Sequence, residues 1–396
     1  MKKLMSLGGN YFQMTAVKAA KRLGYYVIDV DYLENNPAHK YADEYHNIST
    51  LDCENVLKLA KEKEIDGIIS FASDVSAPTA AYVASEMGLP TNSIESVNIM
   101  TRKNLFHPFL KANGFYVPEC KEVTNISQVY EFYDEYKDIM LKPINSSGSK
   151  GVSHITENSQ IMESYDEAKK YSRGDILVVE QFIKRDGYQI AGDAFVVNGQ
   201  VEFFGFANEH FNDNCNALVP VGESFPATLS KKRREIAKKE IQRAISLIEF
   251  KNGPINLDFM FDKEDNIFLI ELAPRSGGNL ITDAIKLSSG VDLAEYAVKV
   301  ALGEDVSDLK EKEFENFISS YIWHSEKNGV YENIDISDML KNKLCLSDMF
   351  VKNGESINRF ENGGYGLGAA LIKYENEEQM LQMMDHMNKY YEIRMR

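Results

Sequence analysis

Two short segments carry side chains whose types and spacing point to chemistry on a phosphate-bearing ligand. Residues 139–152 form an apolar run that reaches Lys142 and continues into a loop of Ser and Gly. Residues 268–278 form a second apolar run, which reaches Glu271 and is followed by Arg275. A half-buried lysine requires an anion, and the backbone N–H groups of a Ser/Gly loop can bind phosphate oxygens. Together the two segments predict an enzyme that spends ATP.

A pair of carboxylates is predicted on two neighbouring strands. Residues 254–261 and 267–272 have strand patterns and are joined by a polar turn, which predicts a hairpin in which Asp258 and Glu271 face each other. Two such carboxylates repel each other unless a cation lies between them. Because Mg²⁺ binds one or two carboxylates together with substrate phosphates, the pair predicts a metal site. The alternative is that both side chains point outward into solvent.

The Ser/Gly loop and Glu180 are the predicted contacts of a nucleotide. The loop, residues 146–151, differs in spacing from the P-loop pattern, and a plain hairpin turn is the alternative. Glu180 lies near the end of a predicted strand over residues 175–183. The backbone of that strand offers N–H and C=O groups to a purine, and Glu180 could accept a hydrogen bond from its exocyclic amine. For Glu180 the alternative is a solvated strand end.

The first hundred residues alternate between strand and helix patterns. Strands are predicted at residues 3–7, 25–30 and 65–71, and helices at residues 15–23, 55–63 and 77–87. Such spacing predicts parallel βαβ units. The pair Gly8-Gly9 lacks the other glycines of a dinucleotide-binding loop, so we interpret it as a tight turn. Asp29, Asp31 and Asp74 follow strands and are predicted to touch a substrate or to form turns and helix caps.

The middle of the chain contains longer elements. They are predicted as a helix at residues 100–114, a hairpin at 188–206 and an amphipathic helix at 231–250. The polar, non-periodic segment 206–216 could line a substrate site, with Glu209 or His210 reading an amine. A flexible surface loop is the alternative for this segment.

The composition excludes several classes of protein. With 396 residues the chain is too long for one core, and its net charge of −16 argues against a general nucleic-acid partner. No apolar run reaches the roughly 18 residues of a membrane helix. The four cysteines lie far apart without a CxxC pair, which indicates reduced thiols rather than disulfides or a zinc site. We therefore expect a cytoplasmic protein with no membrane partner.

The order of these motifs resembles the ATP-grasp superfamily over residues 1–303. The matching positions, in chain order, are Lys103, Lys142 with its Ser/Gly loop, Glu180, Asp258, Glu271 and Arg275. The resemblance implies an α/β and α+β fold: a Rossmann-like N-terminal parallel sheet, a two-lobed ATP-grasp domain and a small C-terminal α+β cap. The implied boundaries are 1–100 for the first domain, 101–186 for the small lobe, 187–303 for the large lobe and 304–396 for the cap.

The same resemblance implies a role for each matching residue. ATP would be contacted by Lys103, Lys142, Ser146, Ser147, Gly148, Ser149, Gly151, Glu180, Gln181, Ile183 and Gln189. Mg²⁺, with Mn²⁺ as a second candidate, would be bound by Asp258 and Glu271. Arg275 and Lys142 would be the catalytic residues, with Arg275 binding a carboxylate or an acyl phosphate; a surface salt bridge is the alternative for Arg275.

Two positions depart from the pattern of the superfamily. Gln189 stands where a ribose-binding Glu is usual, and Ala273 stands where an Asn commonly supplies a metal ligand. Pro274-Arg275 and the cap-like residues 313–396 are similar to the purine-pathway carboxylase and formyltransferase branch. Homodimers are common in that branch, so a homodimer is expected.

The resemblance implies an ADP-forming ligase that activates a small carboxylate as an acyl phosphate and joins it to an amine. A bicarbonate- or formate-using enzyme of the purine-pathway kind is the first alternative. A nucleotide-binding protein without turnover is the second, and Gln189 and Ala273 are the features that favour it.

Overall fold

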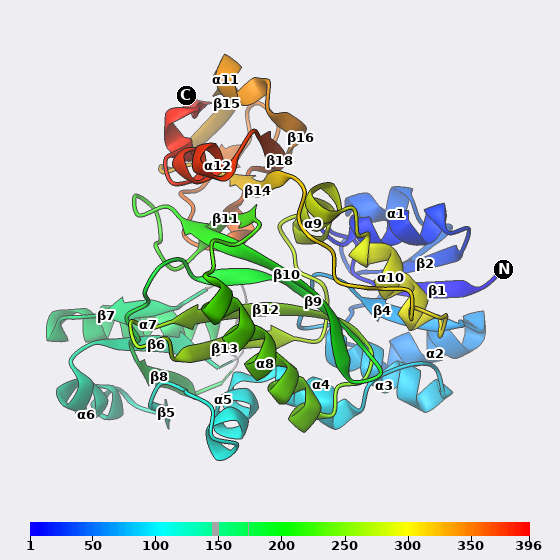
Figure 1. The fold of residues 1–396 in the computed structure, drawn as a ribbon, viewed down its shortest axis with the longest axis horizontal. Coiled ribbons are helices and arrows are strands. Elements are labelled where there is room, and N and C mark those ends of the chain that lie inside the picture. The colour runs from blue at the N-terminus through cyan, green and yellow to red at the C-terminus, as the bar shows by residue number, and fades with distance from the viewer. Residues whose placement is uncertain (145–149, 173) are drawn as a thin grey trace.

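The computed structural model describes residues 1–144, 150–172 and 174–396. A small sheet lies at one side of the molecule, a parallel sheet at the opposite side, and a long antiparallel sheet runs between them and up into the C-terminal region (Figure 1). The predicted Ser146, Ser147, Gly148 and Ser149 lie outside the described residues.

The N-terminal sheet is parallel, in the order β3-β2-β1-β4. Its strands are β1 (Lys3–Leu7), β2 (Tyr26–Val30), β3 (Glu44–His46) and β4 (Gly67–Ser70), and its helices are α1 (Met14–Arg22), α2 (Cys53–Lys63) and α3 (Ala77–Met87). The strands are short, and β1, β2 and β4 are mostly apolar and buried because helices cover both faces of such a sheet. The Asp52 side chain caps α2 by accepting from the backbone N–H of Asn55.

Two helices follow where one was predicted. The helix predicted over residues 100–114 is wrong in extent: α4 (Ile94–Thr101) ends and α5 (Lys103–Ala112) begins at Arg102. The backbone of Arg102 is extended, with φ −114° and ψ 110°, and this change of direction lets Met100 and Phe106 enter the same buried cluster. Lys103 is therefore the first residue of a helix.

The small sheet is antiparallel, in the order β5-β8-β6-β7. Its elements are β5 (Cys120–Val123), α6 (Ile126–Tyr136), β6 (Ile139–Pro143), β7 (Ser153–Ile155), α7 (Ile161–Tyr171) and β8 (Leu177–Gln181). Ile139, Leu141 and Val179 are buried in a core with residues of α6 and α7. Because side chains alternate along a strand, Lys142 and Glu180 lie on the opposite face of the sheet.

The central sheet is antiparallel, in the order β13-β12-β9-β10-β11-β14-β18-β16. Its strands are β9 (Ile190–Val197), β10 (Gln200–Phe211), β11 (Pro220–Phe225), β12 (Gly253–Phe261), β13 (Ile267–Ala273), β14 (Phe317–Trp323), β16 (Leu344–Met349) and β18 (Gly368–Tyr374). Helix α8 (Lys231–Ile248) buries Ile241 and Ile245 in a cluster with Phe206 and Phe259 of this sheet. That cluster covers one face of the sheet, and the other face carries the polar residues described below.

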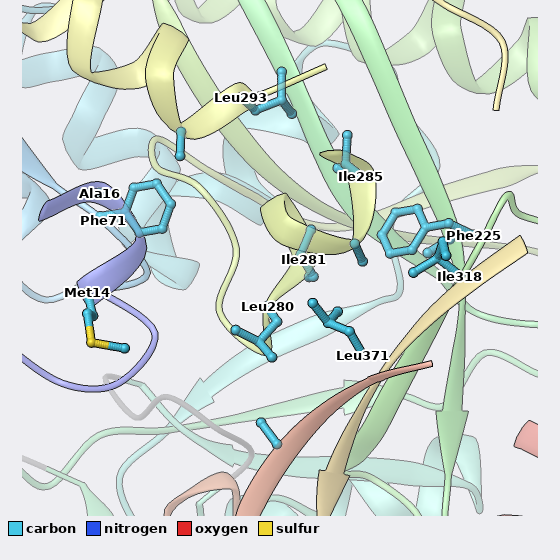
Figure 2. Packing of buried hydrophobic residues seen from close by; sticks show 14 of the residues in the cluster. Met14, Ala16, Phe71, Phe225, Leu280, Ile281, Ile285, Leu293, Ile318 and Leu371 are labelled. Atoms are coloured by element: carbon cyan, nitrogen blue, oxygen red, sulfur yellow. The ribbon is translucent and has the colours of Figure 1, made fainter. Parts of the chain in front are cut away.

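Helix α9 (Ile281–Ser289) joins the parallel sheet to the central sheet. Figure 2 shows Ile281 and Ile285 of α9 between Phe71, which follows β4, and Phe225 of β11. Helix α10 (Leu293–Ala301) packs beside α1. A shared core of this kind fixes the first domain against the central sheet, so residues from both can form one site.

The C-terminal region adds strands to the central sheet and a second small sheet. The further elements are β15 (Gly329–Ile336), α11 (Asp338–Lys341), β17 (Ser356–Ile357), α12 (Glu377–Met384) and β19 (Tyr391–Met395). Helix α12 ends at Met384, and Tyr391 begins β19, where it pairs with Ile336. The predicted fold class is confirmed. Among the residues that the structure describes, no helix is long and apolar enough to cross a membrane.

Candidate active site

Asp258 and Glu271 face each other across two strands of the central sheet. Their Cα atoms are direct register partners in the antiparallel pair of β12 and β13, and a bulge follows Asp258. Burial and the charge of Glu271 raise the pKa of Asp258 to about 8. Burial and the charge of Asp74 raise the pKa of Glu271, while Arg275 and Lys103 oppose that shift. The two carboxylates thus repel each other, and a cation between them would relieve the repulsion.

The pair fits a magnesium ion that also binds a phosphate ligand. Mg²⁺ keeps several waters and takes one or two protein carboxylates together with phosphate oxygens. The Glu271 side chain is 31% exposed, so its oxygens are open to such a ligand. In the described part of the chain, no group of three or more His, Cys, Asp or Glu side chains is arranged to hold a metal by itself. Two carboxylates leave positions around a magnesium ion for phosphate oxygens and waters.

Arg275 is buried and has a partner for each of its five N–H donors. Its Nε and Nη2 donate to the two carboxylate oxygens of Asp74 at 2.7 and 2.9 Å. Its Nη1 donates to Asn256 Oδ1 at 2.7 Å and to the Ser276 carbonyl oxygen at 3.2 Å, and Nη2 also lies 3.4 Å from Glu271 Oε1. The alternative of a surface salt bridge is wrong, since the residue is only 8% exposed.

Asn256 accepts a hydrogen bond from Arg275, and Asp193 in turn holds Asn256 in position. Asp193 is fully buried and accepts from Asn256 Nδ2 at 3.0 Å and from the Gly277 N–H at 2.8 Å. A side chain at Gly277 would lie 2.8 Å from the Asn256 amide, so only glycine allows this approach. Asn256 also stands directly opposite Ala273 in the strand register. The side chain of this register partner of Ala273 is therefore engaged with Arg275 and Asp193.

Lys142 and Glu180 form a buried ion pair on the open face of the small sheet. Lys142 Nζ donates to Glu180 Oε2, and the Glu180 side chain is 4% exposed. His107 of α5 lies on the other side, with its Nδ1 3.2 Å from Glu180 Oε1. Oε1 has no hydrogen-bond partner of suitable geometry in the described residues. A solvated Glu180 is thus wrong, and Oε1 can accept a further hydrogen bond from a donor such as an exocyclic amine.

The backbone beside Glu180 leaves one amide available. The N–H groups of Gln181 and Phe182 donate to the carbonyl oxygens of Glu119 and Asp138 at 2.8 and 3.0 Å. Within the described residues, the N–H of Ile183 donates to no group. The ring of Phe182 stacks on that of His154, with centroids 4.0 Å apart. The Ile183 N–H is a donor and Glu180 Oε1 is an acceptor, and a purine base carries the complementary acceptor and donor on its edge.

Lys103 and Gly151 lie at the borders of this region. The positive charge of Lys103 acts on Asp74 and Glu271, which places it on the side of the carboxylate pair. Gly151 has φ +70° and lies beside a cavity of about 640 Å³ between the small sheet and the C-terminal region. A side chain at Gly151 would lie 3.0 Å from Pro143 and Tyr171.

Glu209 of β10 lies near Asp258 and pairs with Gln189, the residue that directly precedes β9. Gln189 Nε2 donates to Glu209 Oε2 at 2.5 Å. Burial, Asp258 and Glu223 raise the pKa of Glu209 well above its ordinary value. Glu209 lies within β10 and is buried, so a flexible surface loop is wrong for this part of the segment. His210 points to the opposite face, where it contacts Asp385 and Ser224.

The sequence reasoning missed His107, Asp193 and Glu223. His107 stands four residues after Lys103, a spacing that puts both on one helix face. Asp193 is a single polar residue in the otherwise apolar strand β9, and such a residue must find partners. Glu223 pairs with Glu209 in the register of β10 and β11, which only the strand alignment reveals.

Comparisons with known proteins assign a domain to the middle of the chain. Residues 136–283 match the protein family described as ATP-grasp domain. The chain is 27% identical over 317 residues to the uncharacterized protein y4rH of Sinorhizobium fredii, a match that covers 78% of this chain and 63% of that protein. It is 26% identical over 326 residues to the formate-dependent phosphoribosylglycinamide formyltransferase of Bacteroides thetaiotaomicron, covering 79% and 80% of the two chains.

Solved structures share the fold over the whole chain. An L-amino acid ligase from Bacillus licheniformis has a TM-score of 0.82 at 19% identity, covering 100% of this chain and 99% of that one. The biotin carboxylase domain of the Hydrogenobacter thermophilus 2-oxoglutarate carboxylase, solved with MgADP and bicarbonate, has a TM-score of 0.77 at 17% identity, covering 100% and 91%. The predicted resemblance to the ATP-grasp superfamily is confirmed.

Proposed function

The chain carries an ATP-grasp domain at residues 136–283, and from the geometry of its site we propose that it is an ATP-dependent ligase. The proposed reaction activates a small carboxylate as an acyl phosphate, joins the acyl group to an amine, and releases ADP and phosphate. The observation that carries this proposal is the alignment of Asp258 with Glu271 beside the buried Arg275, on a surface that Lys103 also faces.

Adenine binding is assigned to the small sheet. Glu180 Oε1 lies 3.2 Å from His107 Nδ1 without a hydrogen bond of suitable geometry, and it would accept from the exocyclic amine. The Ile183 N–H, which donates to no group in the described residues, would donate to a ring nitrogen. Lys142 and Lys103 would contact phosphates, and the loop that ends at Gly151 would cover them. Ser146, Ser147, Gly148 and Ser149 keep the covering role expected from the resemblance. Gln189 would bond a ribose hydroxyl if it exchanged Glu209 for the sugar.

Asp258 and Glu271 would hold Mg²⁺, and Mn²⁺ is a second candidate. When bound, the ion supplies positive charge to the transferring phosphoryl oxygens. A bound divalent cation would lower the pKa values of Asp258 and Glu271, because its positive charge would offset the repulsion between the two carboxylates. Ala273 contributes no oxygen ligand, so this site has one fewer protein ligand than the pattern with Asn.

Catalysis is assigned mainly to positioning and electrostatic stabilisation. A carboxylate oxygen of the substrate attacks the γ-phosphorus of ATP, the bond from that phosphorus to the β,γ-bridging oxygen breaks, and ADP leaves. The amine then attacks the acyl carbon and expels phosphate. Arg275 would stabilise the developing negative charge, since its fork suits bidentate oxyanions. For direct contact with substrate, Arg275 must release Asp74.

The acceptor amine is assigned to the region of Glu209 and Glu223. The two carboxylates stand side by side in neighbouring strands, and Glu223 is held by Ser320 and Asn279. A carboxylate at this place can accept from an ammonium or take a proton from it.

ADP release with a panel of carboxylates and amines tests the proposal. ADP that appears only with a carboxylate–amine pair supports the ligase. Turnover with bicarbonate or formate favours the purine-pathway alternative, for which the similarity to the formyltransferase of Bacteroides thetaiotaomicron is the supporting observation. Nucleotide binding without ADP in any mixture would support a protein without turnover.

Three further expectations accompany this proposal. The domain boundaries at residues 100, 186 and 303 are testable by limited proteolysis. A homodimer is testable by light scattering, and a cytoplasmic location by cell fractionation.

A further inference from the structure

His107 connects the two halves of the proposed site. Its Nδ1 lies 3.2 Å from Glu180 Oε1 on the small sheet, and its Nε2 lies 3.4 Å from the carbonyl oxygen of Ile270 on the central sheet. Ile270 directly precedes Glu271. The His107 side chain is only 6% exposed, so its ring nitrogens interact with these two protein groups rather than with solvent.

Both ring nitrogens of His107 face acceptors. A neutral imidazole has one N–H donor, whereas the imidazolium has two, so a carboxylate on one side and a carbonyl on the other favour the cation. Burial alone would lower the pKa of His107, but the Cys120 thiol and the Glu180 carboxylate outweigh it and raise the pKa to about 9. A second cation beside Glu180 is Lys142, on β6. Glu180 is thus one buried anion between two cations.

Glu180 needs only one of its two cationic partners, His107 and Lys142, to balance its charge. A buried carboxylate needs one well-placed cation, and removing its only partner would leave an unpaired buried charge. With His107 present, Lys142 can leave Glu180 without that penalty. The Lys142 side chain is 15% exposed and flexible, while the His107 ring is 6% exposed and held on both sides, so Lys142 is the partner able to turn.

We propose that His107 is a positioning residue that keeps Glu180 charged and in place while Lys142 turns from Glu180 to a nucleotide phosphate. The inference rests on the proposed function, because it assumes that ATP binds between the two sheets. No covalent step is involved. His107 acts through Glu180 and Lys142 and touches neither nucleotide nor metal.

The test is a double-mutant cycle on ATP affinity, measured by calorimetry with Mg²⁺ present. His107→Gln keeps a side-chain donor but removes the charge, and we expect the dissociation constant for ATP to rise about tenfold. In a Glu180→Gln background the buried anion is absent, so adding His107→Gln should change the constant less than about twofold. A coupling of this kind is expected only for residues that share one network. His386→Gln, at an exposed histidine, is the matched control and should leave affinity unchanged.

Two results would overturn the inference. An ATP dissociation constant that His107→Gln leaves unchanged is the first. Equal losses with and without Glu180→Gln are the second, because they would show that His107 only supports the fold. A wild-type chain with no measurable affinity for ATP would instead overturn the proposed function, and the inference with it, so the two failures are distinguishable.

A spectroscopic measurement tests the charge of His107 in the wild-type chain itself, and a variant is used only to assign the signal. The ¹³C shifts of the imidazole rings in the wild-type chain report protonation for each of the seven histidines. His107, assigned by the signal lost in a His107→Gln or His107→Asn sample, should remain an imidazolium at pH 8 both with and without ATP. A neutral ring at pH 8 would contradict the inference.

Discussion

Asp74 and Arg275 form a bidentate ion pair between the N-terminal parallel sheet and the central sheet. Asp74 lies in the loop after β4, Arg275 follows β13, and the two N···O distances are 2.7 and 2.9 Å. The same loop is tied to the segment after β13 by a bond from the Ala72 N–H to the Ser276 carbonyl, and Ala72 has φ +50°. The first domain therefore helps to set the position of the arginine beside Glu271.

Replacing Asp74 should loosen this connection. Asp74→Asn keeps the size and one oxygen but removes the charge, so buried Arg275 loses its principal anion. Hydrogen bonds to charged groups are worth about 1.5–3 kcal/mol, and we expect the midpoint of thermal unfolding to fall by roughly 2–4 °C. Asp134→Asn is the control, because Asp134 pairs with Lys137 at the surface with 72% of its side chain exposed. Equal effects of the two substitutions would contradict a structural role for the Asp74 pair.

The metal assignment predicts a separate effect at Glu271. Glu271→Gln keeps the shape of the side chain but removes a formal charge from the carboxylate pair, so Mg²⁺-dependent ADP formation should fall at least about a hundredfold. The fold should be retained, since Glu271 is 31% exposed and its loss relieves repulsion with Asp258. Glu264→Gln, in the exposed turn of the same hairpin, should leave activity unchanged. Normal turnover in Glu271→Gln would exclude the metal site.

Sequence patterns within one strand or one hairpin were sufficient to predict how several candidate site residues lie. An apolar run followed by Lys142 predicts a half-buried lysine, and the hairpin turn between β12 and β13 predicts that Asp258 faces Glu271. The contact of Asp74 with Arg275 joins positions 201 apart and depends on how two sheets pack together, which no local pattern contains. The break at Arg102 was missed because helical spacing continues on both sides of it.

Glu223 predicts a pH dependence of stability. Burial raises its pKa from 4.5 to about 7, although Ser320 and Asn279 donate to it. Between pH 4.5 and 7 the folded chain holds a proton that the unfolded chain has released, so this group makes stability fall as pH rises through that window. Glu223→Gln removes the titration, and the Ser320 hydroxyl can turn to accept from the new amide.

Thermal unfolding at two pH values measures this effect. The difference in midpoint between Glu223→Gln and wild type should favour the variant more at pH 8 than at pH 5, because only at pH 8 does the wild-type chain carry the buried charge. A difference that is the same at both pH values would show that Glu223 does not titrate in this range. Glu361→Gln, at an exposed carboxylate, is the control substitution.

Lys142 is predicted to determine ATP affinity more than it determines stability. Truncating one partner of a buried charge pair costs about 2–5 kcal/mol, and 1.4 kcal/mol is a factor of ten, so Lys142→Ala should raise the ATP dissociation constant at least about thirtyfold. The fold should persist because His107 still faces Glu180. Lys232→Ala removes an ion pair whose lysine side chain is 71% exposed, and it should change affinity less than about twofold. If calorimetry finds the same affinity in Lys142→Ala as in wild type, ATP phosphates do not bind at this lysine, and the nucleotide must lie elsewhere.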